Sequence, residues 1–268
     1  MAGAAAHRGS RAFFSAHPVF RREEYALALG RARDDRTVGS LLSKHLKAGN
    51  IQRIARSVFA SVPPHADAAS WVVDRYLAAS KLKPDAILAY HSALELHGAA
   101  YTDAPEVQAL SAGEPTLFKA PAFSCRFLKL PKGFDEKRDV VRLDRSGLRV
   151  PVTTIERTLV DLFDRPDLAG GAEELWNSLA LVERVKTEDI VRQARGLENA
   201  GAIAALGFWL EHERERLGIP ANSLSVLNAL KPKYPQYVLG ALKGDAKSVA
   251  AWNILVPRGL APPAFEGA

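Results

Sequence analysis

The stretch from Thr37 to Val62 reads TVGSLLSKHLKAGNIQRIARSVFASV, and its hydrophobic period changes at Gly49. Before that glycine, apolar residues recur three, one and four positions apart, as on one face of an amphipathic helix. After it the period is close to two, which is typical of strands, and the Ala-Arg-Ser string predicts a tight turn. We predict a helix from an N-cap at Thr37 to a stop at Gly49, followed by a β-hairpin.

A shorter helix is predicted upstream, over RREEYALALG at residues 21–30. Glu23 and Glu24 suit the positive end of a helix dipole, and Gly30 is a typical helix terminator. A charged link, RARDDR, leads from this helix to the next. The order of helix, link, polar-faced helix, glycine and basic hairpin is that of a winged helix-turn-helix, whose second helix enters the major groove of DNA.

The positive charge of the chain is confined to this region. The whole sequence carries a net charge of +6, whereas residues 1–66 hold eleven Lys or Arg against four Asp or Glu, a net +7. The remaining residues therefore sum to −1. A compact basic module on a near-neutral body is expected of a protein that binds nucleic acid. On charge alone, a solvated basic surface without a partner is an equally good interpretation.

The polar face of the longer helix carries side chains that can donate hydrogen bonds to base edges, namely Ser40, Ser43, Lys44 and Lys47. In the hairpin, Arg53 and Arg56 are expected at the tip, and phosphate contacts are more common than base contacts for such arginines. The competing interpretation is that these are ordinary solvated charges. His45 is expected to lie at the helix surface or to be half buried.

Residues 62–70, VPPHADAAS, suggest a linker, so we place one domain at residues 1–66 and a larger one at 67–268. In the second domain we expect a helix from Ser70 to about Lys81 and another from Asp85 to Gly98. Short strand-like runs follow up to Val152. A capping box from Thr153 to Glu156 begins the next helix, and further helices are expected near 170–183, 187–196, 200–217 and 222–231, before a strand at WNILVP. The fold class is α+β, with a winged helix-turn-helix followed by a larger mixed domain.

Motifs that would supply chemistry are missing from the sequence. It contains no P-loop, no GxGxxG turn and no GxSxG elbow. The acidic string at 135–137 is expected in a solvent-exposed turn, and Arg157 with Asp161 is expected to form a surface ion pair. His91 and His97 are six residues apart and therefore poorly placed as shared metal ligands. We expect no catalytic residue, no cofactor and no metal.

The expected environment follows from similar arguments. One cysteine, Cys125, excludes a disulfide framework, and its position in a strand-like run predicts an inert buried thiol. No run of 18 apolar residues is present, so no membrane partner is expected. The first residues, MAGAAAHRGSRAFF, are interpreted as a loose tail and not as a signal peptide. A cytoplasmic location is the expectation.

Six stretches of the chain resemble the AbiEi antitoxins of type IV toxin–antitoxin systems, in that family's order and over nearly the whole length. They are HPVFRREEYALAL, RTVGSLLSKHLKAGNIQRIARSVFASVP, ILAYHSALELHGAAYT, VTTIERTLVDLFDRPDLAGG, GFWLEHERERLGI and WNILVP. The hairpin and ERTLVD blocks are the most specific. The resemblance differs at the hairpin turn, where the family usually has Arg-Gly and this chain has Arg56-Ser57. Serine tolerates a positive φ less well than glycine, so a different turn is expected.

The resemblance implies a non-catalytic autorepressor that binds inverted repeats in its own promoter, on double-stranded DNA. It also implies an antitoxin domain that counters a cognate nucleotidyltransferase-like toxin, directly or indirectly. The implied DNA face comprises Arg36, Thr37, Ser40, Ser43, Lys44, Lys47, Arg53 and Arg56. Two alternatives stay open: a stand-alone regulator whose second domain binds a ligand or protein, and a nucleic-acid-processing enzyme.

Overall fold

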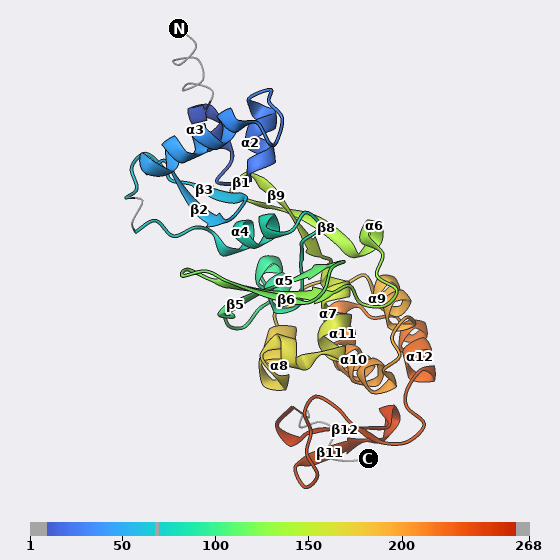
Figure 1. The fold of residues 1–268 in the computed structure, drawn as a ribbon. Coiled ribbons are helices and arrows are strands. Elements are labelled where there is room, and N and C mark those ends of the chain that lie inside the picture. Colours follow the sequence, from blue (N-terminus) through green and yellow to red (C-terminus); the bar gives the residue numbers. More distant parts are fainter. Residues whose placement is uncertain (1–9, 68–69, 261–268) are drawn as a thin grey trace. The chain divides into compact units, whose positions relative to one another are not determined.

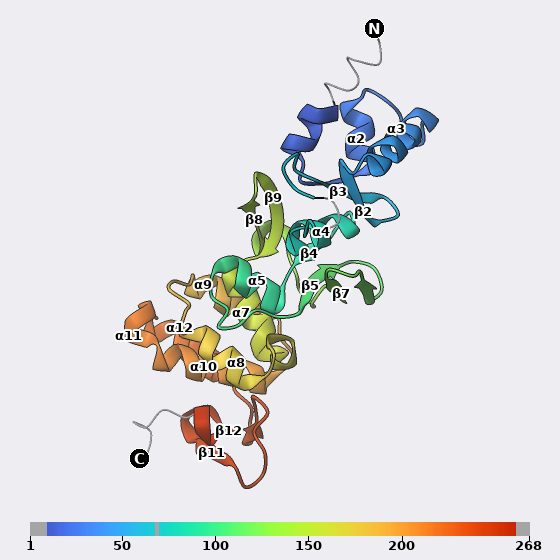
Figure 2. The same ribbon diagram turned by 90° about the vertical axis from the view of Figure 1, so that its left-hand side faces the viewer.

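The structure is a computed structural model that describes residues 10–67 and 70–260. Helices and strands are mixed along the chain, which confirms the predicted α+β class (Figures 1 and 2). Two compact units are present. The first comprises residues 1–88, 105–129 and 142–151, and the second comprises 89–104, 130–141 and 152–268. The first unit thus extends beyond residue 66, and independent folding of residues 1–66 stays a prediction.

The N-terminal part of the first unit has the element order of a winged helix. Residues 10–16 are helical and precede β1 (Val19–Arg21), α2 (Arg22–Ala28), α3 (Arg36–Lys47), β2 (Ile51–Ala55) and β3 (Val58–Ser61). The strands form an antiparallel sheet in the order β1-β3-β2. In Figures 1 and 2 this sheet lies between α4 (Arg75–Leu82) on one side and α2 with α3 on the other.

An aromatic core holds these elements together. Phe13, Phe20, Tyr25 and Phe59 pack against the buried side of α3, and each is less than a tenth exposed. Ser10 Oγ also lies 2.7 Å from the hydroxyl oxygen of Tyr25. The interpretation of residues 1–14 as a loose tail is therefore wrong from Ser10 onward, because Phe13 needs this core to leave water. The part of that interpretation on residues 1–9 lies outside the described residues.

The two helices predicted before the hairpin begin and end close to their expected positions, but the cap of the second differs. Asp35, and not Thr37, is the N-cap of α3, and its carboxylate accepts a hydrogen bond from the backbone N–H of Thr37 at 2.7 Å. Gly49 follows the helix with φ +71°, a left-handed conformation that glycine adopts at little cost. An aspartate carboxylate that accepts from the N–H two residues later is a common capping geometry, so the correction moves the N-cap by two residues.

The rest of the first unit contains α4 and strands of a second sheet. Its six strands follow the order β6-β7-β5-β4-β9-β8, with β5 and β7 parallel. Their bounds are β4 Ile87–Leu88, β5 Glu106–Ser111, β6 Thr116–Lys119, β7 Ser124–Lys129, β8 Val140–Arg145 and β9 Leu148–Thr153. Asp74, and not Ser70, caps α4. Asp85 caps no helix, because its carboxylate accepts hydrogen bonds from the Ser111 hydroxyl and the Ala112 N–H.

The second unit is mainly helical. Its helices are α5 Tyr90–His97, α6 Glu136–Asp139, α7 Ile155–Asp164, α8 Ala172–Leu179, α9 Thr187–Ala194, α10 Ala200–His212, α11 Arg214–Leu217 and α12 Ala221–Ala229, with short 3₁₀ turns at Pro166–Ala169, Ala250–Trp252 and Arg258–Leu260. A small sheet has the order β10-β12-β11, with β10 Gln236–Tyr237, β11 Ala246–Val249 and β12 Ile254–Pro257. Gly207 packs so closely against Trp252 that an added Cβ would lie 2.3 Å from its ring.

Candidate nucleic-acid interface

One face of α3 carries all six helix residues that the sequence predicts on DNA, and all six are exposed: Arg36, Thr37, Ser40, Ser43, Lys44 and Lys47. Successive helical residues are rotated by about 100°, so these six fall within an arc of about 120°. Val38, Leu42 and His45 occupy the opposite side and are buried. The helix is therefore held by its apolar side and presents a continuous face of hydrogen-bond donors to the surroundings.

His45 anchors this helix more deeply than the sequence suggests, since it is only 3% exposed. Its ring meets the ring of Phe14 edge to face, with centroids 4.8 Å apart, and its Nδ1 lies 3.2 Å from the side-chain amide nitrogen of Asn50. The expectation of a surface or half-buried residue is thus corrected to full burial. A polar side chain can be buried here because its ring nitrogen has a hydrogen-bond partner.

The start of α3 is fixed by electrostatic contacts that sequence reasoning missed. The guanidinium of Arg31 donates to the Asp35 carboxylate at 2.9 Å. That hydrogen bond, with the one from the Thr37 N–H, holds the pKa of Asp35 below its ordinary value. Arg22 donates to the backbone carbonyls of Arg33 and Asp35 at 2.9 and 3.2 Å. Both arginines thereby define the loop between α2 and α3.

A depression in the surface follows the exposed face of α3. Its lining comprises Arg22, Asp34, Arg36, Gly39, Ser40, Ser43, Lys44 and Lys47. Five of the eight residues expected on DNA from the sequence line this depression. Arg22 and Asp34 come from outside the predicted set. Asp34 lies two residues before Arg36 in the chain, whereas Arg22 is brought there by the packing of α2 against α3, which no local pattern predicts.

The hairpin forms as predicted, but its two arginines occupy different positions. Arg56 is exposed in the turn between β2 and β3. Arg53 lies within β2, opposite Phe59, with its guanidinium carbon 5.5 Å from the centroid of that ring. The expectation that both mark the tip therefore applies to Arg56 alone. β2 packs beside α3, so the exposed arginines belong to the same module as the helix face.

The turn itself shows how the chain manages without glycine. Neither Arg56 nor Ser57 is among the described non-glycine residues with positive φ. The Ser57 carbonyl instead accepts a hydrogen bond from the backbone N–H of Arg22 at 2.9 Å, at the start of α2. The register of the hairpin also shifts between Arg53 and Ala55, which marks a β-bulge. A turn without left-handed residues agrees with the expected departure from Arg-Gly.

The acidic and basic residues of the second unit form a buried cluster, not a surface pair. Arg157 and Asp161 are 1% and 3% exposed, and Arg157 Nε donates to Asp161 at 2.9 Å. Burial raises the pKa of Asp161 to about 6 against the opposing effect of Arg157. Asp139 is fully buried and accepts hydrogen bonds from Arg192 and Gln193 at 2.8 and 3.0 Å. The surface assignment of the ion pair is wrong because α7 is covered on both sides.

The cap of α7 also differs from the prediction. Thr154 caps the helix by accepting a hydrogen bond from the Arg157 N–H at 3.2 Å. Thr153, expected as the cap, is buried, and its hydroxyl oxygen lies 2.7 Å from that of Thr158. Glu156 accepts a hydrogen bond from the Lys186 N–H at 2.8 Å and so ties α7 to the segment before α9. These contacts give the ERTLVD block a packing role in the structure.

Two further expectations concern reactive groups. Cys125 is buried, and burial raises the pKa of its thiol to about 12, so the thiolate is scarce at neutral pH. His91 and His97 form hydrogen bonds with the backbone carbonyls of Thr102 and Thr153, each at 2.8 Å. Within residues 10–67 and 70–260, no group of three His, Cys, Asp or Glu is placed to hold a metal ion. No helix in the described ranges is both long and apolar enough to cross a bilayer.

Comparisons with known proteins place the fold but no family. No protein-family model matches the chain, and no curated protein matches it either. The crystal structure of the RV2827C protein from Mycobacterium tuberculosis is similar, with a TM-score of 0.64 over 94% of this chain and 91% of that one. The two sequences are 17% identical. At this level of identity the similarity shows a shared fold over nearly the full length.

Proposed function

We propose that this protein is a DNA-binding transcription regulator whose helix α3 enters the major groove. The observation that carries the proposal is the single exposed face of α3, with Arg36, Ser40, Ser43, Lys44 and Lys47 pointing away from the core. The major groove admits one α-helix, and lysine, arginine and serine side chains can bond its base edges. The buried anchors Val38, Leu42 and His45 would hold that helix rigid on the duplex.

The hairpin and the local charge support the same function. Arg53 and Arg56 are exposed on a β-ribbon beside the helix, as the wing of a winged helix would require. A net +7 within residues 1–66 favours contact with phosphates on both sides of a groove. Asp34 borders the same depression. On DNA its carboxylate would accept a hydrogen bond from a cytosine amino group, whereas a nearby phosphate would repel it.

The finer part of the proposal is that the protein represses its own operon and is the antitoxin of a type IV toxin–antitoxin pair. The support is the resemblance of six sequence stretches to AbiEi antitoxins, in the same order along the chain. The second unit would then counter a nucleotidyltransferase-like toxin, by direct binding or through a shared target. The mechanism needs no catalytic residue in this chain, because repression and neutralisation are both binding events.

The DNA-binding part is tested with the 60 base pairs upstream of the gene and with a shuffled duplex of equal composition. Fluorescence anisotropy at 150 mM salt should give at least a hundredfold preference for the upstream sequence. Footprinting should place the protection on inverted repeats. Equal affinity for both duplexes would exclude sequence-specific binding by α3, and no binding to either would exclude the function altogether.

The antitoxin part requires a separate experiment in cells. The reading frame next to this gene is expressed from an inducible promoter, with and without the present chain. The proposal expects growth arrest by the neighbour alone and rescue on co-expression. If the neighbour is harmless, or if arrest persists, the antitoxin role is excluded and a stand-alone regulator is favoured. Robust cleavage of DNA or RNA by the purified protein with Mg²⁺ or Mn²⁺ would favour the enzymatic alternative.

A further inference from the structure

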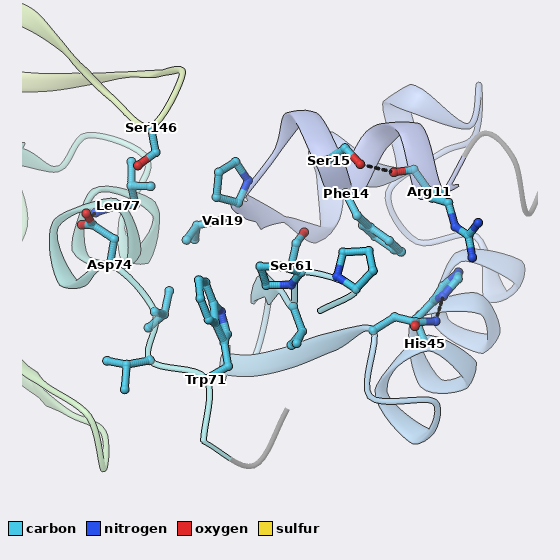
Figure 3. A pocket seen from close by; sticks show the side chains of 17 residues that line it. Arg11, Phe14, Ser15, Val19, His45, Ser61, Trp71, Asp74, Leu77 and Ser146 are labelled. Atoms are coloured by element: carbon cyan, nitrogen blue, oxygen red, sulfur yellow. Dashed lines mark hydrogen bonds between the residues drawn. The ribbon is translucent and has the colours of Figure 1, made fainter. Parts of the chain in front are cut away.

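A pocket of about 830 Å³ lies in the first unit, on the buried side of the winged helix. Figure 3 shows Arg11, Phe14 and His45 together at one end and Asp74, Leu77 and Ser146 at the other, with Trp71 between them. The pocket is thus built by the N-terminal helix, α3, and the segment that enters α4. Its volume lies within the range of sites that hold small organic molecules.

The walls of the pocket are largely apolar. Phe14, Val19, Trp71, Val73 and Leu77 contribute rings and branched side chains to its lining. Flat aromatic groups fill such a space well, because they bury a large area with few rotatable bonds. The shape and the lining therefore favour a planar aromatic ligand over an extended or strongly hydrated one.

One buried donor in this lining has no partner among the residues that the structure describes. The indole Nε1 of Trp71 is shielded from solvent and forms no hydrogen bond with any described residue. Tryptophan N–H groups usually find an acceptor when buried, because an unmet donor loses its hydration without compensation. A ligand that brings an acceptor oxygen to this nitrogen would satisfy it.

The charged groups of the pocket are Asp74 and the exposed Arg11, and they differ in whether a partner holds them. The Asp74 carboxylate is already engaged by the backbone N–H groups of Tyr76 and Leu77 and by the guanidinium of Arg145. The Ser61 hydroxyl donates to the His17 carbonyl at 2.7 Å. For the Arg11 guanidinium, by contrast, no carboxylate partner is found among residues 10–67 and 70–260. The pocket therefore offers an exposed cation and a buried N–H donor, and its one carboxylate is already paired with Arg145.

We propose that this pocket binds an aromatic carboxylate, with the ring between Phe14, Val19 and Leu77 and the carboxylate within reach of Trp71 Nε1 or Arg11. A ligand of this class would match the apolar lining with its ring, and the Trp71 N–H or the Arg11 cation with its carboxylate. Binding at this site needs no DNA and can be measured on the isolated protein.

A regulatory consequence rests on the proposed DNA-binding function. His45 lines the pocket and belongs to α3, on the side opposite the exposed donors. A ligand in contact with His45 or Phe14 changes the packing on the buried side of α3. It would therefore favour one position of that helix. Ligand binding would then alter DNA affinity, because the ligand and the duplex contact opposite sides of one helix.

The binding site is tested by calorimetry with two matched probes, indole-3-carboxylate and indole, which differ by the carboxylate alone. We expect indole-3-carboxylate to bind the full-length protein at least tenfold more tightly than indole. Trp71→Phe and Arg11→Gln should each weaken binding of the carboxylate by about fivefold or more, and Trp71→Phe should change indole binding less than twofold. Trp176→Phe, in the second unit, is the matched control and should leave both affinities unchanged.

A second variant keeps the test decisive if Trp71→Phe is unstable. Ser15 is exposed and lines the pocket, so Ser15→Trp should occupy part of the pocket from the solvent side and abolish binding of both probes. Absence of binding by both probes at millimolar concentrations to the wild type would overturn the proposal. So would indole-3-carboxylate binding that neither Ser15→Trp nor Arg11→Gln affects.

The regulatory arm uses the upstream duplex described above. Saturating indole-3-carboxylate should change the Kd for that duplex at least threefold in the wild type and not in Ser15→Trp. Calorimetric binding with an unchanged DNA Kd would overturn the coupling and leave the binding site in place. Failure of all DNA binding would instead contradict the proposed function, while the calorimetric result still decides the pocket.

Discussion

Arg22 donates a hydrogen bond from its guanidinium to the backbone carbonyl oxygen of Asp35 at 3.2 Å, and so connects the first residue of α2 with the N-cap of α3. A second bond from Arg22 reaches the carbonyl of Arg33 at 2.9 Å. The planar guanidinium spans two carbonyls that a lysine ammonium would reach less well. The angle at which α3 leaves the loop therefore depends on one side chain of the preceding helix.

Replacing Arg22 by lysine tests positioning separately from charge. Arg22→Lys keeps the net charge of the module but loses the two-carbonyl contact, so the start of α3 should become less rigid. We expect affinity for the upstream duplex to fall about fivefold, equivalent to about 1 kcal/mol for one lost hydrogen bond. Anisotropy titrations measure this, and Arg195→Lys in the second unit is the control. An unchanged Kd would mean that Arg22 contributes only charge.

Lys44 is one of two exposed lysines on the polar face of α3. Lys44→Gln should weaken binding to the upstream duplex by about 1–3 kcal/mol if the side chain contacts a base, and by less on shuffled DNA. Lys243→Gln removes the same charge from an exposed position in the second unit and should have little effect. Equal losses on both duplexes for Lys44→Gln would assign it to phosphate.

The dependence of binding on salt reports how many phosphates the module neutralises. If a monomer contacts about five phosphates, log K should fall against log salt with a slope near −4 to −5, and two copies on an inverted repeat should about double it. Arg56→Gln in the hairpin turn should reduce the slope by about one per copy, with a similar effect on both duplexes. A slope near zero would contradict electrostatic binding by this module.

Asp139 is expected to make the stability of the protein depend on pH below 4. Burial opposes its ionisation, but hydrogen bonds from the Asp135 N–H, Arg192 and Gln193 outweigh it, so its folded-state pKa lies below 3.8. The carboxylate therefore stabilises the folded state above that pH, and the contribution disappears as the pH falls through the folded pKa. Asp139→Asn should cost about 3 kcal/mol at pH 7, since it removes the buried negative charge that Arg192 and Gln193 contact.

Urea denaturation of the wild type and Asp139→Asn between pH 7 and pH 3 measures this directly. The difference in unfolding free energy should be constant from pH 7 to pH 5 and shrink as the pH falls below 4. Asp245→Asn, in an exposed loop region of the same unit, supplies a comparison with the same chemical change. A difference that stays the same down to pH 3 would show that the contribution of Asp139 is not one of charge.

Two helix glycines should respond oppositely to alanine. In Gly207→Ala the new Cβ would lie 2.3 Å from the Trp252 ring, so overpacking should destabilise the protein by about 1–3 kcal/mol or more. In Gly39→Ala the nearest atom is a flexible Arg22 nitrogen at 3.5 Å, and removal of a mid-helix glycine should stabilise by about 0.5–1 kcal/mol. Thermal unfolding of both variants checks the signs, and equal effects would contradict the packing argument.

Hydrophobic period, glycine positions and charge along the chain were sufficient to predict the α+β class, the helix-and-hairpin order from Arg22 to Val62 and the exposed face of α3. These features depend on neighbours within a few residues, so local patterns contain them. The position of Gly49 and the run from Ser40 to Lys47 predict a helix with one polar side whatever it packs against.

Burial of polar groups, in contrast, was decided by tertiary contacts. His45, Asp139, Arg157 and Asp161 all resemble surface residues in the sequence, yet each is buried because segments distant in the chain cover it. Arg22 reaches the α3 loop, and Trp71 reaches the pocket, through packing of the same kind. The hydrophobic period predicts which side of a helix or strand is apolar. It does not predict which residue pairs with a buried charge, or whether a buried indole N–H finds an acceptor. Both depend on the distance between elements that are far apart in the chain.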